Sequence, residues 1–557
     1  MDTDGSRRPV IMAVDDDPQV SRAVARDLRR RYAQQYRVIR AESGDEAIMA
    51  LRELAMRGDS VALLMADYRM PVMSGIAFLE QALTLYPTAR RVLLTAYADT
   101  EAAIDAINVV DLDHYLLKPW SPPEELLYPV LDDLLDEWEG AGPAQLVELR
   151  VVGHRWSAAT AAVRNFLVRA QAAYAWFPID EPAGEQLAAA VGLDPAKLPA
   201  VITAAGEVLV EPTEADLARC LGLATVPVRT VYDLVVAGAG PAGLAAAVYG
   251  ASEGLKTLLV ERSTAGGQAG QSSRIENYLG FPDGVTGAQL TERARRQAAK
   301  FGAEMVTTRT VTGLERNGAA HTVSFADGSS VAAHAVLLAT GVSYTTLDIP
   351  GVEELTGFGV YYGASPHQAV ECGGNDVFIV GGANSAGQAA IHFAHRARLV
   401  TMLVRGPNLA ASMSQYLADR IAATANIRVK TRTEVIGASG TTHLEQLTLA
   451  DHGTGVAETV PAQWLFLFIG AQPRTDWLGP DVCRDRHGFI VTGPDLIDHP
   501  DFRRSWPLPR SPYHLESSAP GVFVAGDSRA NSGKRVASAV GEGAMAVMLI
   551  NRYLAQS

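Results

Sequence analysis

The sequence predicts an α/β protein of several domains, with mostly parallel sheets in its first and last parts. Its 557 residues are too many for one hydrophobic core and indicate about three to four domains. Short apolar strands alternate with helical stretches along most of the chain, an order typical of parallel sheets whose strands are joined by helices. The composition, 48% hydrophobic and 20% charged, is that of an ordinary globular protein.

Charge, hydropathy and cysteine content exclude several other classes of protein. A net charge of −14 argues against a nucleic-acid-binding surface, which would be basic. No apolar run approaches the roughly 18 residues of a membrane span, and the N-terminus lacks the apolar core of a secretory signal. The three cysteines, Cys220, Cys372 and Cys483, lie far apart and form no C-x-x-C, which fits a reducing cytoplasm. We therefore expect a cytoplasmic protein that binds no nucleic acid and has no membrane span.

Polar residues follow the predicted strands of the N-terminal segment at the point where each strand ends. The strand VIMAV is followed by Asp15 and Asp16, ALLMAD ends in Asp67, a third strand ends in Thr95, and YLLKPW supplies Lys118. Because the carboxyl ends of strands in a doubly wound sheet share one edge, we expect these side chains to meet. Clustered carboxylates suit Mg²⁺, and the metal and the lysine together would stabilise a phosphoryl group on an aspartate.

This pattern closely resembles a response-regulator receiver domain, over about residues 8–130. The resemblance implies a two-component system in which a cognate histidine kinase phosphorylates the protein. Residue by residue, it assigns Asp67 as the phosphoacceptor, Asp15, Asp16 and Asp67 as the Mg²⁺ ligands, Thr95 as the switch hydroxyl, Lys118 as the site lysine and Tyr115 as the switch aromatic.

The second segment is predicted to form strand, helix, strand, helix, hairpin and helix in that order. This order resembles a thioredoxin or glutaredoxin fold, with Leu198-Pro199 where that family carries a cis-proline before a strand. The loop after the first strand, GHRWSAAT, contains no cysteine, and thiol chemistry needs a thiolate. We therefore favour a docking or spacer domain over a catalytic one.

The third segment opens with a nucleotide-binding turn, DLVVAGAGPAGLAAAVYGASEGLKTLLVER. Gly238 permits the tight turn, Gly240 lets the backbone approach a pyrophosphate, and Gly243 allows close packing of helix on strand. The helix N-terminus offers free N–H groups to phosphates, and Glu261 follows at the distance where an acid binds ribose hydroxyls. Strand, turn, helix and acid in this order predict a dinucleotide site.

A second turn, DVFIVGGANSAGQAA, repeats the order of strand, turn and helix. Gly381, Ala383 and Ala386 take the places of the three glycines, so backbone approach is more crowded at Ala383. Arg405 follows the next strand, and an arginine there favours the 2′-phosphate of NADP, although Gly406 stands beside it where a second cation would strengthen the preference. The sequence leaves NADPH and NADH both open.

Together with LLATG and GVFVAGDSRANSGKRVASAVGEGAMA, the two turns resemble the pyridine-nucleotide flavoproteins, in particular the low-molecular-weight thioredoxin reductases, over about residues 231–557. The resemblance implies two nested Rossmann-like domains and a homodimer. It implies contacts to FAD from Gly238, Gly240, Pro241, Ala242, Gly243, Glu261, Gly267, Gln268, Asn277, Asp527, Arg535, Val536 and Ala537. It implies contacts to NAD(P) from Gly381, Ala383, Asn384, Ser385, Ala386 and Arg405.

The redox disulfide of that family is missing from this sequence. Thioredoxin reductases place C-x-x-C shortly before the second turn, and Gly363 and Pro366 stand at those two positions. Cys372 has no partner cysteine nearby, and we interpret it as a packing residue. His367 is either a proton donor at the flavin or a loop histidine with a backbone hydrogen bond.

These observations predict a phosphorylation-regulated, FAD-dependent NAD(P)H oxidoreductase whose electron acceptor is not an internal disulfide. The acceptor is left open among a quinone, a carrier protein, oxygen and a partner disulfide. The alternative is a redox-sensing module that binds FAD, turns over little and acts through protein partners. The predicted domains are a receiver at 1–140, a thioredoxin-like domain at 141–226, an FAD-binding domain at 227–347 and 471–557, and an NAD(P)-binding domain at 348–470.

Overall fold

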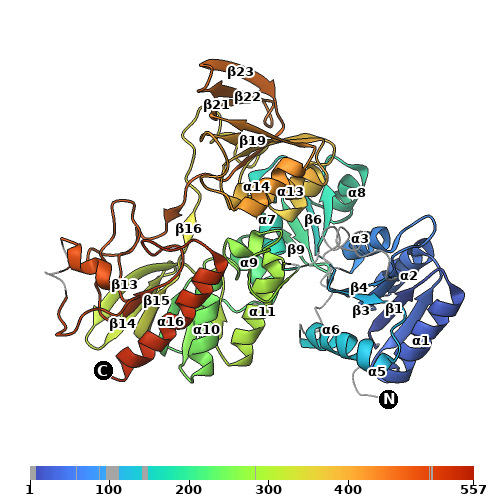
Figure 1. Cartoon of the computed structure of the whole chain (residues 1–557), viewed down its shortest axis with the longest axis horizontal. Coiled ribbons are helices and arrows are strands. Elements are labelled where there is room, and N and C mark those ends of the chain that lie inside the picture. The colour runs from blue at the N-terminus through green and yellow to red at the C-terminus, as the bar shows by residue number, and fades with distance from the viewer. Residues whose placement is uncertain are drawn as a thin grey trace. The chain divides into compact units, whose positions relative to one another are not determined.

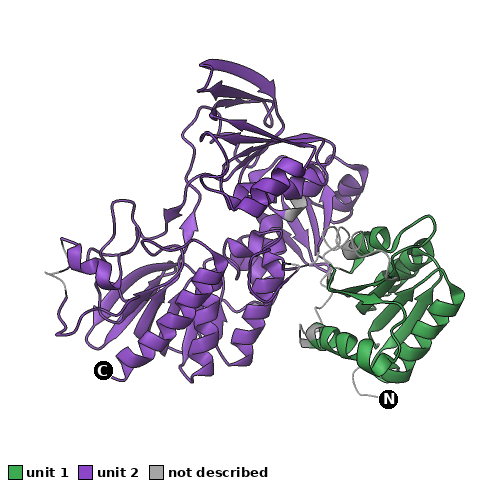
Figure 2. Ribbon diagram, viewed as in Figure 1, with its two compact units in different colours: residues 1–148 green, residues 149–557 purple. Residues whose placement is uncertain are grey.

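The computed structural model divides into two compact units, residues 1–148 and residues 149–557 (Figure 2). Each unit has its own hydrophobic cores and is described by itself, with the element labels of Figure 1. No helix in the described part of the chain is long and apolar enough to cross a membrane. The structure describes residues 8–57, 59–86, 88–95, 112–140, 149–172, 174–282, 284–500, 502 and 506–556.

The first unit is built on a parallel sheet of five strands in the order β2-β1-β3-β4-β5, which confirms the predicted doubly wound sheet. Alternate residues of the central strand β1 enter two different cores, Val10, Met12 and Val14 on one face and Ile11 and Ala13 on the other. Because helices cover both faces, the central strands are continuous apolar runs. The strands are β1 (Val10–Val14), β2 (Arg37–Ala41), β3 (Val61–Asp67), β4 (Arg90–Thr95) and β5 (His114–Leu117).

Three helices of this unit, α1, α2 and α3, begin at side chains that cap them. Asp17, Ser43 and Ser74 each accept a hydrogen bond from a backbone N–H of the first turn that they precede. The described helices are α1 (Pro18–Tyr32), α2 (Gly44–Met56), α3 (Gly75–Leu85), α5 (Pro123–Leu126) and α6 (Tyr128–Gly140).

The second unit starts with a four-stranded sheet in the order β7-β6-β8-β9, in which β6 pairs parallel with β7 and antiparallel with β8. The order of strands and helices is the one that the sequence predicts for this segment. The Leu198–Pro199 peptide bond is cis and directly precedes β8. The elements are β6 (Leu149–Gly153), α7 (Ala158–Arg169), β7 (Tyr174–Pro178), α8 (Pro182–Ala190), β8 (Ala200–Ile202), β9 (Val208–Val210) and α9 (Glu214–Cys220).

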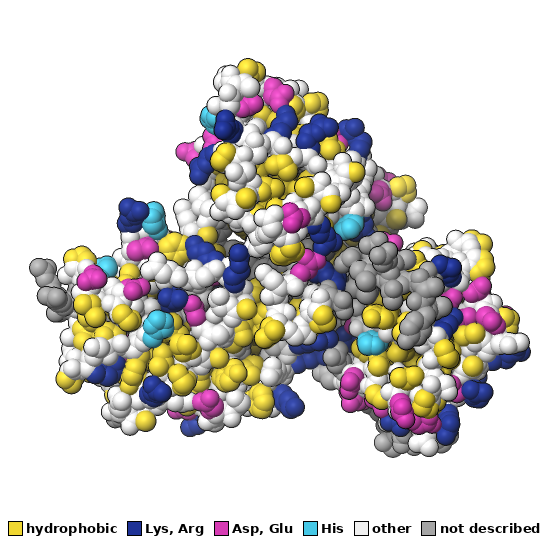
Figure 3. Space-filling model, in the orientation of Figure 1, with side chains coloured by type: hydrophobic (Ala, Val, Ile, Leu, Met, Phe, Trp, Pro, Cys, Tyr) yellow, Lys and Arg dark blue, Asp and Glu magenta, His cyan; other side chains and the backbone are white. Residues whose placement is uncertain are grey.

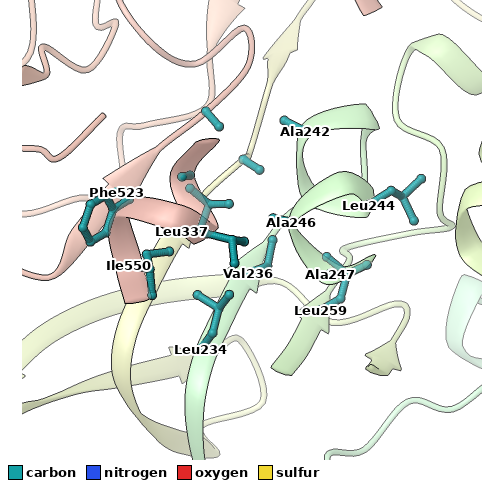
Figure 4. Packing of buried hydrophobic residues seen from close by; sticks show 14 of the residues in the cluster. Leu234, Val236, Ala242, Leu244, Ala246, Ala247, Leu259, Leu337, Phe523 and Ile550 are labelled. Atoms are coloured by element: carbon teal, nitrogen blue, oxygen red, sulfur yellow. The ribbon is translucent and has the colours of Figure 1, made fainter. Parts of the chain in front are cut away.

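A seven-stranded sheet follows, in the order β12-β11-β10-β15-β14-β13 with β26 beside β15. Helices α10 (Pro241–Ser252) and α16 (Val536–Leu554) pack together on one face, where Leu234, Val236 and Leu337 of the sheet meet Ala246 of α10 and Ile550 of α16 (Figure 4). The strands are β10 (Val231–Ala237), β11 (Thr257–Val260), β12 (Glu304–Val306), β13 (Val311–Asn317), β14 (Ala320–Phe325), β15 (Ser330–Leu338) and β26 (Val522–Val524).

Two glycines allow the close approach of α10 to its neighbours. A Cβ atom on Gly243 would lie 1.8 Å from the carbonyl oxygen of Gly238, and one on Gly543 would lie 2.2 Å from that of Ala242. No side chain fits at either position, so glycine is required for α10 to sit against the turn before it and against α16.

Between β15 and β26 the chain forms a second set of sheets. A parallel sheet has the order β17-β24-β18-β19-β20, and an antiparallel sheet has the order β21-β22-β23. The chain enters through β16 (Val342–Ser343) and leaves through β25 (Gln472–Pro473), and these two short strands pair antiparallel. The other elements are β17 (Val360–Tyr362), α12 (Pro366–Glu371), β18 (Asp376–Val380), α13 (Asn384–Ala394), β19 (Leu399–Val404), α14 (Gln415–Ala423), β20 (Ile427–Thr431), β21 (Thr433–Ser439), β22 (Gln446–Asp451), β23 (Val456–Pro461) and β24 (Trp464–Leu467).

Candidate functional sites

The first unit brings its predicted site residues together at the carboxyl end of its sheet. Asp67 ends β3, Asp15 and Asp16 follow β1, and Lys118 follows β5. One carboxylate oxygen from each aspartate lies within 4.8 Å of the other two, a spacing that suits one metal ion. The Lys118 Nζ atom lies 2.7 Å from Asp15 Oδ2 and 2.6 Å from Asp67 Oδ1. The expected cluster therefore exists in this unit.

The charges of Asp15, Asp67 and Lys118 influence one another because these side chains are mostly buried, whereas Asp16 is exposed. Burial raises the pKa of Asp15 above its ordinary value, although the hydrogen bond and the charge of Lys118 lower it. Burial lowers the pKa of Lys118, but its hydrogen bonds to Asp15 and Asp67 and their charges outweigh this and raise the pKa. Thr95 is buried at the end of β4, and Tyr115 on β5 is 39% exposed. The site thus joins acceptor carboxylates to a lysine that stays protonated.

The second unit contains a cavity of about 440 Å³ between its two sets of sheets. Eleven of the thirteen residues expected to contact FAD line it, whereas Gly243 and Ala537 do not. The lining residues from that expected set are Gly238, Gly240, Pro241, Ala242, Glu261, Gly267, Gln268, Asn277, Asp527, Arg535 and Val536.

The first glycine turn opens directly on this cavity. Gly238 has a φ of 108°, and a Cβ there would lie 2.3 Å from the carbonyl oxygen of Ala339, so only glycine fits. Gly240 is the residue before α10, whose unpaired N–H groups therefore point toward the cavity. Buried Glu261 accepts hydrogen bonds from the N–H of Ala239 at 2.8 Å and of Ser263 at 3.1 Å, which fix its carboxylate at the cavity wall.

Other cavity residues offer polar groups that suit a dinucleotide. Burial raises the pKa of Asp527, although the charge of Lys534 lowers it. Gln268 Nε2 donates to the carbonyl oxygen of Val342 at 2.8 Å and is thereby held across the two sets of sheets. Thr340 lines the cavity, and within the described part of the chain its buried Oγ1 has no hydrogen-bond partner. A hydroxyl-rich, anionic ligand such as FAD fits this set of groups.

The second turn faces the same cavity through α13. Asn384 and Ser385 at its start line the cavity, whereas Gly381, Ala383 and Ala386, which form the turn, do not. Arg405 follows β19, and its side chain is 85% exposed, 3.8 Å from Glu434. The Arg405 guanidinium is therefore accessible to a ligand.

A histidine that sequence reasoning did not single out also lines the cavity. His392 lies two turns along α13 from Asn384, and Gln388 lies between them, so one polar stripe of this helix faces the cavity. The buried Nε2 of His392 has no hydrogen-bond partner within the residues that the structure describes. Burial lowers the pKa of His392 to about 4, so its imidazole is neutral at pH 7. The spacing of four residues between polar side chains in an otherwise apolar helix is the signal that could have found it.

The segment that lacks the family's cysteines has two other candidate residues. His367 lies on α12, but its side chain falls outside the described residues, so its expected role stays a prediction. Cys372 is fully buried in the core beside α13, and this burial raises the pKa of its thiol. Its surroundings agree with the interpretation of Cys372 as a packing residue.

Comparison with known proteins also separates an N-terminal part of the chain from a longer C-terminal part. A family model described as response regulator receiver domain matches residues 11–128, and one described as pyridine nucleotide-disulphide oxidoreductase matches residues 232–543. The chain is 30% identical to thioredoxin reductase of Treponema pallidum (strain Nichols) over 331 residues, 58% of this chain and 98% of that protein. It is 32% identical to thioredoxin reductase of Mycolicibacterium smegmatis over 334 residues, 59% of this chain and 98% of that protein. It is similar to the crystal structure of Lactococcus lactis thioredoxin reductase, with a TM-score of 0.52, 26% identity and coverage of 58% of this chain and 100% of that one.

Proposed function

The chain belongs to the pyridine nucleotide-disulphide oxidoreductase family, and from that membership we propose that it is an FAD-dependent NAD(P)H oxidoreductase regulated by phosphorylation. It is a thioredoxin-reductase-like flavin oxidoreductase fused to a receiver domain. One observation supports the proposal above the others: residues that follow both glycine turns line a single cavity. Two nucleotides held in one cavity would be placed near each other, as hydride transfer between them requires.

The residues that would hold FAD are those of the first turn and its surroundings. The N-terminus of α10 at Gly240 would stabilise a pyrophosphate, Glu261 would accept hydrogen bonds from ribose hydroxyls, and Asp527 lines the same cavity. When bound, FAD supplies two-electron chemistry, accepting a hydride from a nicotinamide and passing electrons onward.

The residues that would hold the nicotinamide nucleotide begin at Asn384 and Ser385. Their place at the start of α13 lets the helix N-terminus stabilise a second pyrophosphate. The exposed Arg405 would recognise the 2′-phosphate of NADPH, since a guanidinium pairs well with phosphate. Neutral His392 would accept or donate a single hydrogen bond on this wall without adding charge.

The acceptor of the electrons is proposed to be something other than an internal disulfide. Gly363 and Pro366 stand where the family has its two cysteines, and neither side chain carries a redox group. Cys372 is buried in the core and does not line the cavity, so it offers no alternative thiol. A quinone, oxygen, a carrier protein or a partner disulfide that reaches the flavin directly would each serve.

The receiver domain supplies the proposed regulation. Its histidine kinase would transfer a phosphoryl group to Asp67, with Mg²⁺ held by Asp15, Asp16 and Asp67. Lys118, already paired with Asp67, would stabilise the added charge. We also propose that the protein acts as a homodimer, as its family suggests.

Rapid mixing of the yellow protein with NADPH or NADH under anaerobic conditions tests the oxidoreductase proposal. We expect the flavin band to bleach within the time of one turnover and to return when an acceptor such as a quinone is added. A protein that binds FAD but is not reduced by either nucleotide would contradict the enzyme and favour the redox-sensing alternative. A protein that binds no FAD would contradict both.

The regulatory part is tested on the same reaction after phosphorylation. Treatment with acetyl phosphate and Mg²⁺ should change the rate of flavin reduction or reoxidation in the wild type and leave it unchanged in Asp67→Asn. Equal rates before and after phosphorylation of the wild type, with phosphorylation itself verified by mass spectrometry, would contradict regulation.

A further inference from the structure

Helix α7, which precedes the first glycine turn in sequence, contacts both nucleotide-binding parts of the second unit (Figure 1). Ser365 Oγ donates to Asn165 Oδ1 at 2.5 Å, and Ser365 itself lines the cavity. Arg164 pairs with Glu371 of α12, and both side chains are largely buried. Just beyond the helix, Gln171 Nε2 donates to the carbonyl oxygen of Ala288 at 2.9 Å. Helix α7 is therefore fixed beside the cavity from both sides.

The last residue of this helix, Arg169, lines the cavity. Four further arginines line it as well; of these, Arg262 is next to Glu261 and is exposed, and Arg474 is next to β25. Arg169 and Arg474 are partly buried, and within the described part of the chain neither guanidinium group has a hydrogen bond or an ion pair. An arginine held at a partly buried wall without a partner is costly, because its charge has lost water and gained nothing in return.

The pKa values of Arg169 and Arg474 also show that these charges have lost water without gaining a close partner. Burial lowers the pKa of Arg169 below its ordinary value, and the charge of Arg262 adds to this while Glu261 opposes it. Burial and the charges of Arg262 and Arg169 lower the pKa of Arg474 to about 10, against the opposing charge of Glu261. The charges of Arg169 and Arg474 thus interact with the carboxylate of Glu261 and repel the charge of Arg262. Because more basic than acidic side chains line the cavity, it suits an anionic group such as a pyrophosphate.

We propose that Arg169 is a ligand of the adenosine diphosphate part of FAD, so that the segment 149–223 completes the cofactor site of the domain that follows it. Arg169 and Glu261 line the same cavity and their charges interact; because an acid at the place of Glu261 binds the ribose, the contact is assigned to the adenosine diphosphate part rather than to the flavin ring. The inference rests on the proposed FAD site and adds a role for this segment, which contains no cysteine in the loop before α7.

Equilibrium binding of FAD, ADP and FMN to the full-length apoprotein tests this proposal. Arg169→Gln should weaken FAD and ADP binding about tenfold or more, since a charge-assisted hydrogen bond to phosphate is lost. FMN, which lacks the adenosine part, should bind the variant and the wild type within about twofold of each other. Arg169→Lys keeps the charge but not the planar guanidinium group, so its affinity for FAD should lie between those of the wild type and Arg169→Gln.

A matched control comes from the loop before the same helix. Arg155 lies just before α7, is paired with Glu181 at 2.6 Å and does not line the cavity, so Arg155→Gln should leave FAD binding unchanged. Melting of each apoprotein separates loss of a ligand contact from loss of fold, because Arg169→Gln should melt without FAD close to the wild type. An FAD affinity for Arg169→Gln within twofold of wild type, or an equal loss for FMN and FAD, would overturn the inference while leaving the FAD enzyme intact. A wild type that binds no FAD would overturn the proposed function and this inference with it.

Discussion

At the scale of single residues, the receiver site depends on three groups from three strand ends. Asp15, Asp67 and Lys118 come from separate parts of the chain, and the parallel sheet brings them within hydrogen-bond distance. Each strand contributes one or two side chains at its carboxyl end, which is why a pattern of short motifs in the sequence was enough to predict the cluster.

We predict that Asp67 is the residue modified by a phosphoryl donor. With acetyl phosphate and Mg²⁺, the wild type should gain one phosphoryl group by intact-protein mass spectrometry, and Asp67→Asn should gain none, because the amide cannot accept it. Asp45 is an exposed acid in the first turn of α2, and Asp45→Asn should be labelled like the wild type. Labelling of Asp67→Asn to the wild-type level would contradict the assignment.

A second prediction at this scale concerns acid stability and His321 on β14. His321 is 2% exposed; burial, with the charge of Arg316, lowers its pKa to about 4, against a hydrogen bond to the backbone of Pro520. The unfolded chain therefore binds a proton between about pH 6.5 and 4 that the folded chain does not, so stability falls as pH is lowered through this window. From pH 7 to pH 5 this one group should cost about 2 kcal/mol.

Thermal melting at pH 7 and pH 5 measures this effect. His321→Gln, which keeps a hydrogen-bond donor but does not titrate, should lose less melting temperature between the two pH values than the wild type does. Exposed His334 provides the control, since His334→Gln should keep the wild-type pH dependence. Equal pH dependence in all three proteins would refute the role of His321.

At the scale of elements, the contact of α7 with α12 joins the segment 149–223 to the segment before the second glycine turn. Arg164 contacts Glu371, hydrogen-bonds Tyr174 at 3.2 Å and lies over the ring of Trp176 at 4.4 Å. Near the start of α7, the Trp156 ring stacks on His443 with centroids 4.7 Å apart. These contacts are largely buried, so we interpret the segment 149–223 as a fixed part of the second unit.

We predict that the buried Arg164–Glu371 pair contributes more to the stability of the second unit than an exposed ion pair in the segment 149–223. Arg164→Met leaves the Glu371 carboxylate buried without its partner and should destabilise the second unit by about 3 kcal/mol. Arg155→Met removes an exposed pair with Glu181, whose side chains are 35% and 51% exposed, and should cost less than about 1 kcal/mol. Denaturant unfolding followed by tryptophan fluorescence compares the two variants. Similar losses of unfolding free energy in the two variants would show that burial does not set the energy of the Arg164 contact.

At the scale of the whole molecule, the second unit presents an apolar face over α10 and α16. Figure 3 shows hydrophobic side chains gathered over this part of the surface. Tyr249 on α10 is 46% exposed, and Met545 and Met548 on α16 are 43% and 46% exposed. Large apolar side chains grouped on a surface are typical of an interface between proteins.

We predict that this face takes part in the proposed homodimer. Met548→Glu would place a charge in the interface and should convert a dimer to a monomer, or raise the dissociation constant at least about tenfold. Sedimentation velocity of the full-length protein measures this, with Met49→Glu on the exposed side of α2 as the control. A wild type that is monomeric, or a dimer unaffected by Met548→Glu, would contradict the prediction.

Local patterns in the sequence predicted the strands that lead into the expected sites and both glycine turns, and the misses have physical reasons. Strand β2, RVIRA, was not among the predicted strands, because it lies at a sheet edge and mixes charged with apolar residues. His392 was missed because its importance depends on which face of α13 meets the cavity. Arg169 was missed because nothing in the sequence links it to Glu261, far along the chain.

The sequence by itself determined the α/β class, the receiver cluster, the two nucleotide turns and the loss of the family's cysteine pair. Each of these follows from residues close in sequence, where strand, turn and helix N-terminus fix the geometry locally. Only the tertiary structure decided that the first turn and the start of α13, which follows the second turn, line one cavity and that α7 contributes Arg169 to its wall. These arrangements depend on how separate sheets and helices pack, and packing is set by the complementary surfaces of elements distant in the chain.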